Sequence, residues 1–286
     1  MGIKVHRHPD ASSFLRRAEA WLLRSEVENN IILGLCGPFG PAASDPPPDL
    51  YLATVEEAGD VVACAARTPP YNPIITRGDQ RALRCLVDDL LDRYGGLPAV
   101  TGPEPEVGHF AQLWSERTGV ATRRGVQQRL FENRQVQLLP RRPAGQLRLA
   151  IEADLSVIAE WLPAFYGETL PGDPRLSPQA EAQRRVSQGR MFVWEDGQPV
   201  SMAGWTACTR SNVRVSLVYT PPEFRQRGYA SACVADLTQR LLSQGCSYCC
   251  LYTDLANPTS NSIYQKIGYR PVCDNSDYIL AGPASA

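Results

Sequence analysis

The sequence lacks an excess of charge of either sign. Its 29 lysine and arginine residues nearly balance 30 aspartate and glutamate residues, which gives a net charge of −1 at pH 7. Nucleic acids and anionic membrane surfaces attract proteins mainly through concentrated positive charge. The charge balance therefore indicates neither a nucleic-acid partner nor a membrane partner.

Long apolar runs are also absent. No stretch approaches the roughly 18 consecutive apolar residues that a membrane-spanning helix needs. The first residues, MGIKVHRHPDASSF, contain neither an apolar signal core nor a small-residue cleavage site. We therefore expect a soluble, cytoplasmic protein. At 286 residues the chain has the length of about two ordinary domains, and nothing in it indicates an oligomeric state.

The cysteines and histidines argue against disulfides, metal and a histidine triad. The nine cysteines are odd in number and lie in apolar segments such as VVACAAR and CCLYT, where thiols pack as small apolar groups. A closed zinc site needs about four nitrogen or sulfur ligands, but Cys246 and Cys249 form the only C-x-x-C pair. Because His6, His8 and His109 all lie in the first half, a Ser-His-Asp triad is excluded in the second. We expect no metal, and strand packing accounts for the cysteine pair.

Two short segments resemble each other at a constant offset. Val55–Thr68 and Val193–Thr206 agree at several positions, and each reads as two β-runs around a turn with glycine. The second hairpin extends over residues 191–208. The repeat indicates a duplicated architecture, although one hairpin echo can also arise by chance.

Prolines and arginines interrupt regular patterns at LLPRRPAG, Leu138–Gly145. We place the linker there, which divides the chain into residues 1–140 and residues 146–286.

The second half begins with two helix patterns. Apolar residues at helical spacing predict a helix over Asp154–Tyr166, broken only at Pro163. Ser177, a good N-cap, and Pro178, at the first helical position, start a second short helix that Gly189 ends.

A basic turn then lies between a strand and a helix. Alternating residues predict a strand with two faces over Val213–Tyr219, and an apolar stripe predicts a helix from Ala230 that Gly245 stops. The turn Arg225–Ala230 therefore lies at a helix N-terminus, where free N–H groups and the helix dipole favour an anion. Gly228 lets the backbone approach closely. An arginine-rich loop without a ligand is the alternative explanation.

The segment LYTDLANPTSNSIYQKIGY, Leu251–Tyr269, predicts a strand, a turn and a short helix that Gly268 ends. Asn257 and Tyr264 are seven residues apart, so they share one helix face, roughly 10 Å apart along the axis. They could line one groove. Alternatively, Asn257 is only an N-cap and Tyr264 only a half-buried aromatic residue.

These motifs together resemble the GNAT superfamily of acyl-CoA-dependent N-acetyltransferases over about residues 146–280. The resemblance implies an α/β (α+β) fold in which a mixed, mostly antiparallel sheet is flanked by helices, with a final strand at Tyr278–Leu280. It also implies acetyl-CoA as the co-substrate and an amine acceptor, a primary amine of a small molecule or peptide that attacks the acetyl group directly.

The resemblance also implies the roles of residues. Tyr264 would be the general acid that protonates the coenzyme sulfur, and a strand N–H near Val218 would stabilise the oxyanion. The residues that would bind the coenzyme lie at the strand end, in the turn and at the second motif: Val218, Tyr219, Thr220, Arg225, Gln226, Arg227, Gly228, Tyr229, Ala230, Ser231 and Asn257.

The general base stays unassigned. Where many members of the family carry a glutamate, this sequence has Arg214, Ser216 and Tyr252. An acyl-CoA-binding regulatory module without turnover is therefore the alternative to an enzyme. The acids that could reach the acceptor are Asp254, Glu195, Glu168 and Asp173.

The acceptor side offers only weak indications. By the same resemblance, the loop Gly167–Leu176 shapes the acceptor site. Trp194 and Trp205 are either pocket walls or core residues.

The first half looks like a degenerate copy of the same fold. Arg77-Gly78 matches part of the basic turn of the second half, but Ile75 and Gln80 stand where that turn has its first arginine and its alanine. The first half also lacks a pair that corresponds to Asn257 and Tyr264. We predict that residues 1–140 bind no coenzyme and pack on the catalytic half. His109 is either a structural residue or a catalytic one that acts across the interface.

Overall fold

The chain divides into two compact units. Unit 1 contains Met1–Leu130 and Val272–Ala286, and unit 2 contains Phe131–Pro271. Two strands, β6 (Arg123–Asn133) and β12 (Arg270–Ile279), run through the unit boundaries. The computed structural model describes residues 2–280 except 38–39, 41, 43–45, 170–176, 208 and 210.

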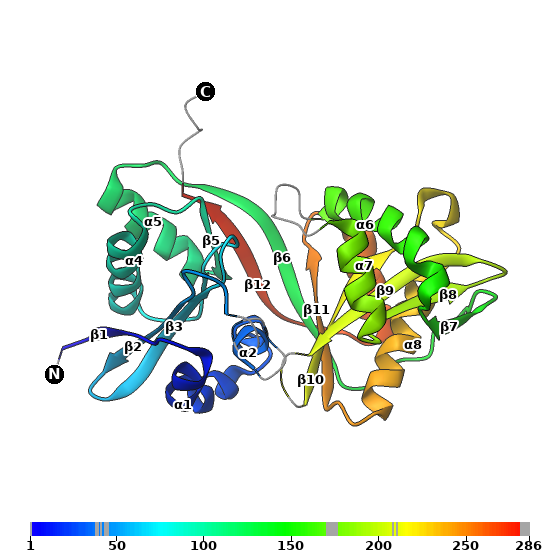
Figure 1. Cartoon of the computed structure of the whole chain (residues 1–286), viewed down its shortest axis with the longest axis horizontal. Helices are drawn as coiled ribbons and strands as arrows, with labels where there is room; N and C mark the ends of the chain where they lie inside the picture. The colour runs from blue at the N-terminus through cyan, green and yellow to red at the C-terminus, as the bar shows by residue number, and fades with distance from the viewer. Residues whose placement is uncertain are drawn as a thin grey trace. The chain divides into compact units, whose positions relative to one another are not determined.

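Unit 1 is a mixed sheet with helices on both faces (Figure 1). In chain order it contains β1 (Lys4–Arg7), α1 (Ala11–Leu22), the short 3-10 helix η1 (Leu23–Ser25), α2 (Asn30–Cys36), β2 (Tyr51–Glu57), β3 (Asp60–Arg67), β4 (Ile74–Ile75), α4 (Gln80–Tyr94), β5 (Ala99–Pro103) and α5 (Glu106–Thr118). Its strands lie in the order β1-β2-β3-β4-β5-β12, and only the β4–β5 pair is parallel.

Unit 2 repeats this plan. In chain order it contains β7 (Gln146–Leu149), the 3-10 helix η2 (Glu152–Asp154), α6 (Leu155–Thr169), α7 (Pro178–Ser187), β8 (Met191–Glu195), β9 (Pro199–Ala207), β10 (Asn212–Tyr219), η3 (Pro222–Phe224), α8 (Tyr229–Ser243), β11 (Tyr248–Asp254) and α9 (Pro258–Ile267). The strands lie in the order β7-β8-β9-β10-β11, and only the β10–β11 pair is parallel.

Both units therefore follow one succession of elements. A first strand and two helices are followed by a hairpin and a third antiparallel strand, and a helix then leads to a parallel strand and a last helix. The predicted fold class, a duplicated and mostly antiparallel α/β architecture, is confirmed. The last strand of the chain, β12, pairs antiparallel with β5 in unit 1 through Asn275–Ile279.

Within each unit, the strands separate two cores. In unit 1, α1 and α2 cover one face, and α4 and α5 cover the other. In unit 2, α6 and α7 enclose a core with Met191 and Met202, whereas α8 and α9 enclose one with Trp194 and Phe192. This division follows the alternation of side chains along strands that are buried on both faces. None of the described helices is both long and apolar enough to cross a membrane.

The capping residues recognised in the sequence predicted most helix ends of unit 2 correctly. Ser177 caps α7 by accepting a hydrogen bond from the N–H of Ala180, and Pro178 is its first residue. The predicted break at Pro163 is wrong, because α6 continues through this residue to Thr169. A proline removes only one helix hydrogen bond, and a helix can bend around it.

A buried ion pair joins α6 to α7. The Glu181 side chain is only 6 % exposed, and its carboxylate accepts a hydrogen bond from the Tyr166 hydroxyl at 2.8 Å. Its other oxygen lies 3.3 Å from the Arg185 guanidinium. Burial lowers the pKa of Arg185, and the neighbouring charge of Glu181 partly offsets this effect.

We predict that Glu181→Gln destabilises unit 2 by about 3 kcal/mol, because it leaves the Arg185 charge buried without a counter-ion. Glu160→Gln removes an exposed carboxylate from α6 and serves as the control, with an expected change within about 0.5 kcal/mol. Urea unfolding followed by circular dichroism measures both. Equal stability of the two variants would contradict the prediction.

Candidate active site

A β-bulge reverses the direction of the side chains near the end of β10. Val213 and Val215 pack in the core under α8 and α9, whereas Leu217 and Tyr219 pack in the core under α6 and α7. The register with β9 shifts between Ser216 and Tyr219, and Leu217 has a left-handed φ of 53°. The bulge accounts for the reversal. The predicted two-faced alternation therefore holds only up to Ser216.

β10 and β11 also separate at this point. Their parallel pairing covers Asn212–Arg214 and ends at the pair of Arg214 with Cys250. Both strands continue, β10 to Tyr219 and β11 to Asp254. Because their second halves form no ladder with each other, this part of β10, including Val218, presents a backbone edge that an extended ligand can pair with.

The helix that follows, α8, begins without a side-chain cap. Gln226 and Gly228 have left-handed φ values of 63° and 85°. Gly228 occupies the N-cap position and carries no side chain that could accept the first N–H groups. Such free donors, together with the helix dipole, attract anions. The predicted turn and helix therefore have the geometry that the sequence indicated.

The corresponding helix of unit 1, α4, is closed by a carboxylate. Asp79 accepts a hydrogen bond from the N–H of Ala82 at 2.8 Å, and its second oxygen bonds the Arg81 guanidinium at 3.1 Å. The hydrogen bond from Ala82 is the main reason why the pKa of Asp79 lies below its usual value. An internal negative charge thus occupies the place that an anionic ligand would take.

The arginine of unit 1 that matches an arginine of the Arg225–Ala230 turn also forms ion pairs within the protein. Arg77 pairs with Glu28 at 2.5 Å and with Glu106 at 2.9 Å. His109 lies on α5 of the same unit.

In unit 2, Arg225 is held by the protein itself. Its Nε donates to the carbonyl of Thr220 at 2.9 Å, and its Nη2 pairs with the Glu168 carboxylate at 2.7 Å. The hydrogen bond to Glu168 raises the pKa of Arg225. Burial, followed by the charge of Glu168, raises the pKa of the nearby Tyr219.

The other acids proposed as bases are engaged too. Glu195 pairs with Arg148 at 2.9 Å, and Asp254 accepts a hydrogen bond from the N–H of Ala256 at 2.8 Å. Asp173, with most of the predicted acceptor loop, lies outside the described residues.

Tyr264 lies on the buried side of α9. Its side chain is 8 % exposed, and its ring meets the Tyr269 ring edge-on, with 6.0 Å between the centroids. Burial, with a smaller contribution from Cys233, raises the pKa of Tyr264 to about 12. The phenol is therefore neutral at physiological pH and carries a proton that it can donate.

Asn257 caps α9. Its Oδ1 accepts a hydrogen bond from the N–H of Ser260 at 3.0 Å. The interpretation of Asn257 as an N-cap is therefore correct, and its contact with the coenzyme stays a prediction.

Two more residues of the turn have partners within unit 2. The Tyr229 hydroxyl donates to Asp196 at 2.5 Å, and this bond raises the pKa of Tyr229. Asp196 lines a cavity of about 530 Å³ together with Gly145, Gln146, Glu195 and Gly197. The Arg227 guanidinium lies 5.8 Å from the centre of the Phe224 ring.

The tryptophans and cysteines belong mainly to the core. Trp194 is fully buried, and Trp205 packs partly buried against the same core. Cys249 is also fully buried, and burial raises its pKa to about 12, so the thiol stays protonated at neutral pH. Strand packing therefore accounts for Cys249.

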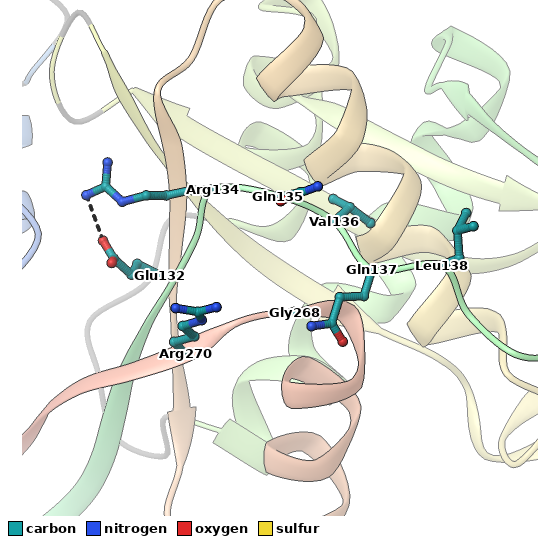
Figure 2. Close-up of a pocket in the computed structure, with 8 residues that line it drawn as sticks. All are labelled: Glu132, Arg134, Gln135, Val136, Gln137, Leu138, Gly268 and Arg270. Carbon is teal, nitrogen blue, oxygen red and sulfur yellow. Dashed lines mark hydrogen bonds and ion pairs between the residues drawn. The ribbon is translucent and has the colours of Figure 1, made fainter.

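A further cavity of about 520 Å³ lies at the C-terminal end of α9 (Figure 2). Arg134 and Glu132 form an ion pair at one wall, and Gly268 ends the helix at another. None of the residues predicted to bind the coenzyme lines this cavity. Its lining residues are Glu132, Arg134, Gln135, Val136, Gln137, Leu138, Gly268 and Arg270.

Sequence reasoning missed Ser201 of β9. This residue is fully buried, and its hydroxyl donates to the carbonyl of Tyr219 at 3.0 Å and lies 2.9 Å from the Thr220 hydroxyl. A single serine in an apolar strand carries no motif, so only the fold places it beside the predicted site.

Comparisons with known proteins support the resemblance to the GNAT superfamily. Residues 194–278 match the family model of the FR47-like protein. Curated proteins give no match. A solved GCN5-related N-acetyltransferase from Sphaerobacter thermophilus is similar with a TM-score of 0.66 and 13 % identity, over 99 % of this chain and 98 % of that one.

Two other solved structures are also similar over nearly the whole length of this chain and of their own. A tandem GNAT protein from the clavulanic acid biosynthesis pathway has a TM-score of 0.57 and 12 % identity, over 99 % of this chain and 100 % of its own. A GNAT-family acetyltransferase from Colwellia psychrerythraea has a TM-score of 0.58 and 11 % identity, over 96 % and 98 %. At sequence identities this low, the structural similarity establishes a shared fold and nothing more specific. The chain thus has the GNAT fold. The match of residues 194–278 to the FR47-like family model supports the resemblance of the second half to the GNAT superfamily.

We predict that Asn257→Ala lowers the free energy of unfolding of unit 2 by about 1 kcal/mol, because α9 loses its N-cap. Asn257→Ser keeps an oxygen that can accept the Ser260 N–H and should retain most of the stability. Urea unfolding compares the two. A serine variant as unstable as the alanine variant would show that the cap is not what stabilises this position.

Proposed function

We propose that the protein is an N-acetyltransferase that moves the acetyl group of acetyl-CoA to a primary amine of a small molecule or peptide. The catalytic domain in this proposal is the one predicted for residues 146–286, of which the part up to Pro271 lies in unit 2. The observation that carries it is the uncapped start of α8, which follows β10 after η3 and the turn, where β10 no longer pairs with its parallel neighbour β11. The GNAT fold supports the same chemistry. The cytoplasmic location expected from the sequence stays a prediction.

The coenzyme binds along the end of β10 and across the turn. The backbone of Val218–Thr220 pairs with the pantetheine arm, and the N–H groups from Gln226 to Ser231 bind the pyrophosphate. The N–H of Arg225 itself donates to the carbonyl of Pro222. The side chain of Arg225 is bound to Glu168 and Thr220. We therefore assign the phosphate contacts of this turn mainly to its backbone.

The reaction begins when the amine nitrogen attacks the thioester carbonyl carbon. An N–H near Val218 stabilises the oxyanion of the tetrahedral intermediate, a contribution of roughly 3 kcal/mol in comparable sites. The carbon–sulfur bond then breaks, and the Tyr264 hydroxyl gives its proton to the sulfur, so that coenzyme A leaves as a thiol. The attacking nitrogen releases a proton to solvent to form the amide, and the Tyr264 phenolate takes up a proton from solvent, which restores the acid. General acid catalysis of this kind typically contributes about 10² to 10⁴-fold.

Unit 1 does not bind coenzyme in this proposal. The Asp79 carboxylate stands at the start of α4, and Arg77 is neutralised by two glutamates. Residues 1–140 instead support the catalytic domain.

We predict that Tyr264→Phe lowers kcat by about 100-fold and leaves the dissociation constant of coenzyme A nearly unchanged. Thiol release from acetyl-CoA with a panel of amines measures kcat, and calorimetry measures binding. Because the pKa of Tyr264 is about 12, the acid stays protonated up to that range. The wild-type rate should therefore show no loss from tyrosine ionisation between pH 7 and 10.

Tyr278→Phe, which changes a tyrosine of β12 in unit 1, is the control and should retain full activity. A Tyr264→Phe variant with wild-type kcat would remove this residue from the mechanism.

A regulatory module that binds acyl-CoA without turnover is the second candidate. The engagement of Glu168, Glu195 and Asp254 favours it, because a general base needs a free carboxylate. Tight binding of coenzyme A, with no product from any amine and no effect of Tyr264→Phe, would decide for this candidate.

We predict that Gly228→Asp weakens the binding of coenzyme A at least about tenfold more than Gly228→Asn. Both side chains meet the same left-handed backbone, so the difference between the variants isolates the negative charge at the helix start. Calorimetry at low and high salt measures it, and salt should reduce the difference. Equal affinities would show that no anion binds at this helix start.

A further inference from the structure

Two consecutive carbonyl groups at the end of β10 are each held by a side chain. The Ser201 hydroxyl donates to the carbonyl of Tyr219 at 3.0 Å, and Arg225 Nε donates to the carbonyl of Thr220 at 2.9 Å. The serine comes from β9 and the arginine from the turn before α8. Two separate elements thus fix the backbone where the strand ends.

The single hydrogen of the Ser201 hydroxyl decides which group donates in each of its two hydrogen bonds. A serine hydroxyl has one hydrogen, and Ser201 gives it to the carbonyl of Tyr219, which can only accept. In the 2.9 Å contact between the two hydroxyls, Thr220 must therefore be the donor and Ser201 the acceptor. The buried serine is satisfied on both sides, and its one proton is committed to the strand end.

This segment needs such support. It follows the bulge with the left-handed Leu217, and it lies beyond the last pair that β10 forms with β11. Ladder hydrogen bonds to β11 are therefore missing where the backbone is most irregular. The Ser201 side chain supplies a fixed hydrogen bond from the β9 side.

We propose that Ser201 is a positioning residue for the coenzyme, an inference that rests on the proposed function. It does not touch the coenzyme. It holds the carbonyl of Tyr219 toward β9, and Arg225 holds the carbonyl of Thr220 from the turn before α8, so that the partial negative charges of both carbonyl oxygens are compensated by donors. The strand end and the turn then present mainly N–H donors to the pantetheine and the pyrophosphate.

Ser201→Ala tests this inference, with Thr238→Val as the matched control. Thr238 is also fully buried in unit 2, and its hydroxyl lies 2.8 Å from the Tyr269 hydroxyl. Each variant removes one buried hydroxyl and should lower the thermal unfolding midpoint. Calorimetric titration of the full chain with coenzyme A needs no acceptor. We expect Ser201→Ala to raise the dissociation constant about tenfold and Thr238→Val to change it less than twofold.

Three results would overturn the inference. If the wild type binds coenzyme A and Ser201→Ala binds it equally well, Ser201 does not position the site. If both variants lose affinity equally, the role of Ser201 is only structural. If the wild type gives no heat with coenzyme A, the proposed function itself fails. Should Ser201→Ala not fold, Ser201→Cys has a similar shape and a weaker donor, and the same rise in the dissociation constant is expected.

Discussion

The β-bulge in β10 is the constraint on which the candidate site depends. Leu217 adopts a left-handed backbone there, and Leu217 and Tyr219 pack under α6 and α7, whereas Val213 and Val215 pack under α8 and α9. The bulge follows the last pair that β10 forms with β11, Arg214 with Cys250, and beyond it the carbonyl of Tyr219 accepts a hydrogen bond from Ser201. A strained backbone of this kind persists only where its surroundings hold it. The packing of Tyr219 and the hydrogen bond from Ser201 do so here.

The two units differ at the N-cap position of one helix, which decides whether a side chain or a ligand can accept the first N–H groups of that helix. They share the succession of elements and the single parallel strand pair. Yet the N-cap of α4 is Asp79, whose carboxylate accepts the N–H of Ala82, and the N-cap of α8 is Gly228, which has no side chain. A duplicated fold can therefore lose an anion site through a single good N-cap, because the cap that stabilises the helix uses the same donors.

Local features could be predicted from the sequence, and long-range ones could not. The helices α7, α8 and α9 begin and end near Ser177, Gly228, Asn257 and Gly268, because capping chemistry lies within a few residues. The bulge left no signal, since the apolar Leu217 fits a regular alternation as well as a reversed one. The partners of Arg225 and Tyr219 come from α6 and β9, far away in the sequence. The place of β12 beside β5 likewise depends on the fold of the whole chain.

In the proposed reaction, Tyr264 is the general acid, whereas the general base stays unassigned. Burial keeps Tyr264 neutral, because a phenolate in this environment would lose its hydration. Glu168 and Glu195 are held in ion pairs, and Asp254 accepts a hydrogen bond from the N–H of Ala256. The same desolvation that raises the pKa of a phenol lowers the pKa of an amine. An acceptor that reaches the buried thioester would thus shift toward its neutral, nucleophilic form, so burial itself performs part of the work that a carboxylate base would otherwise do.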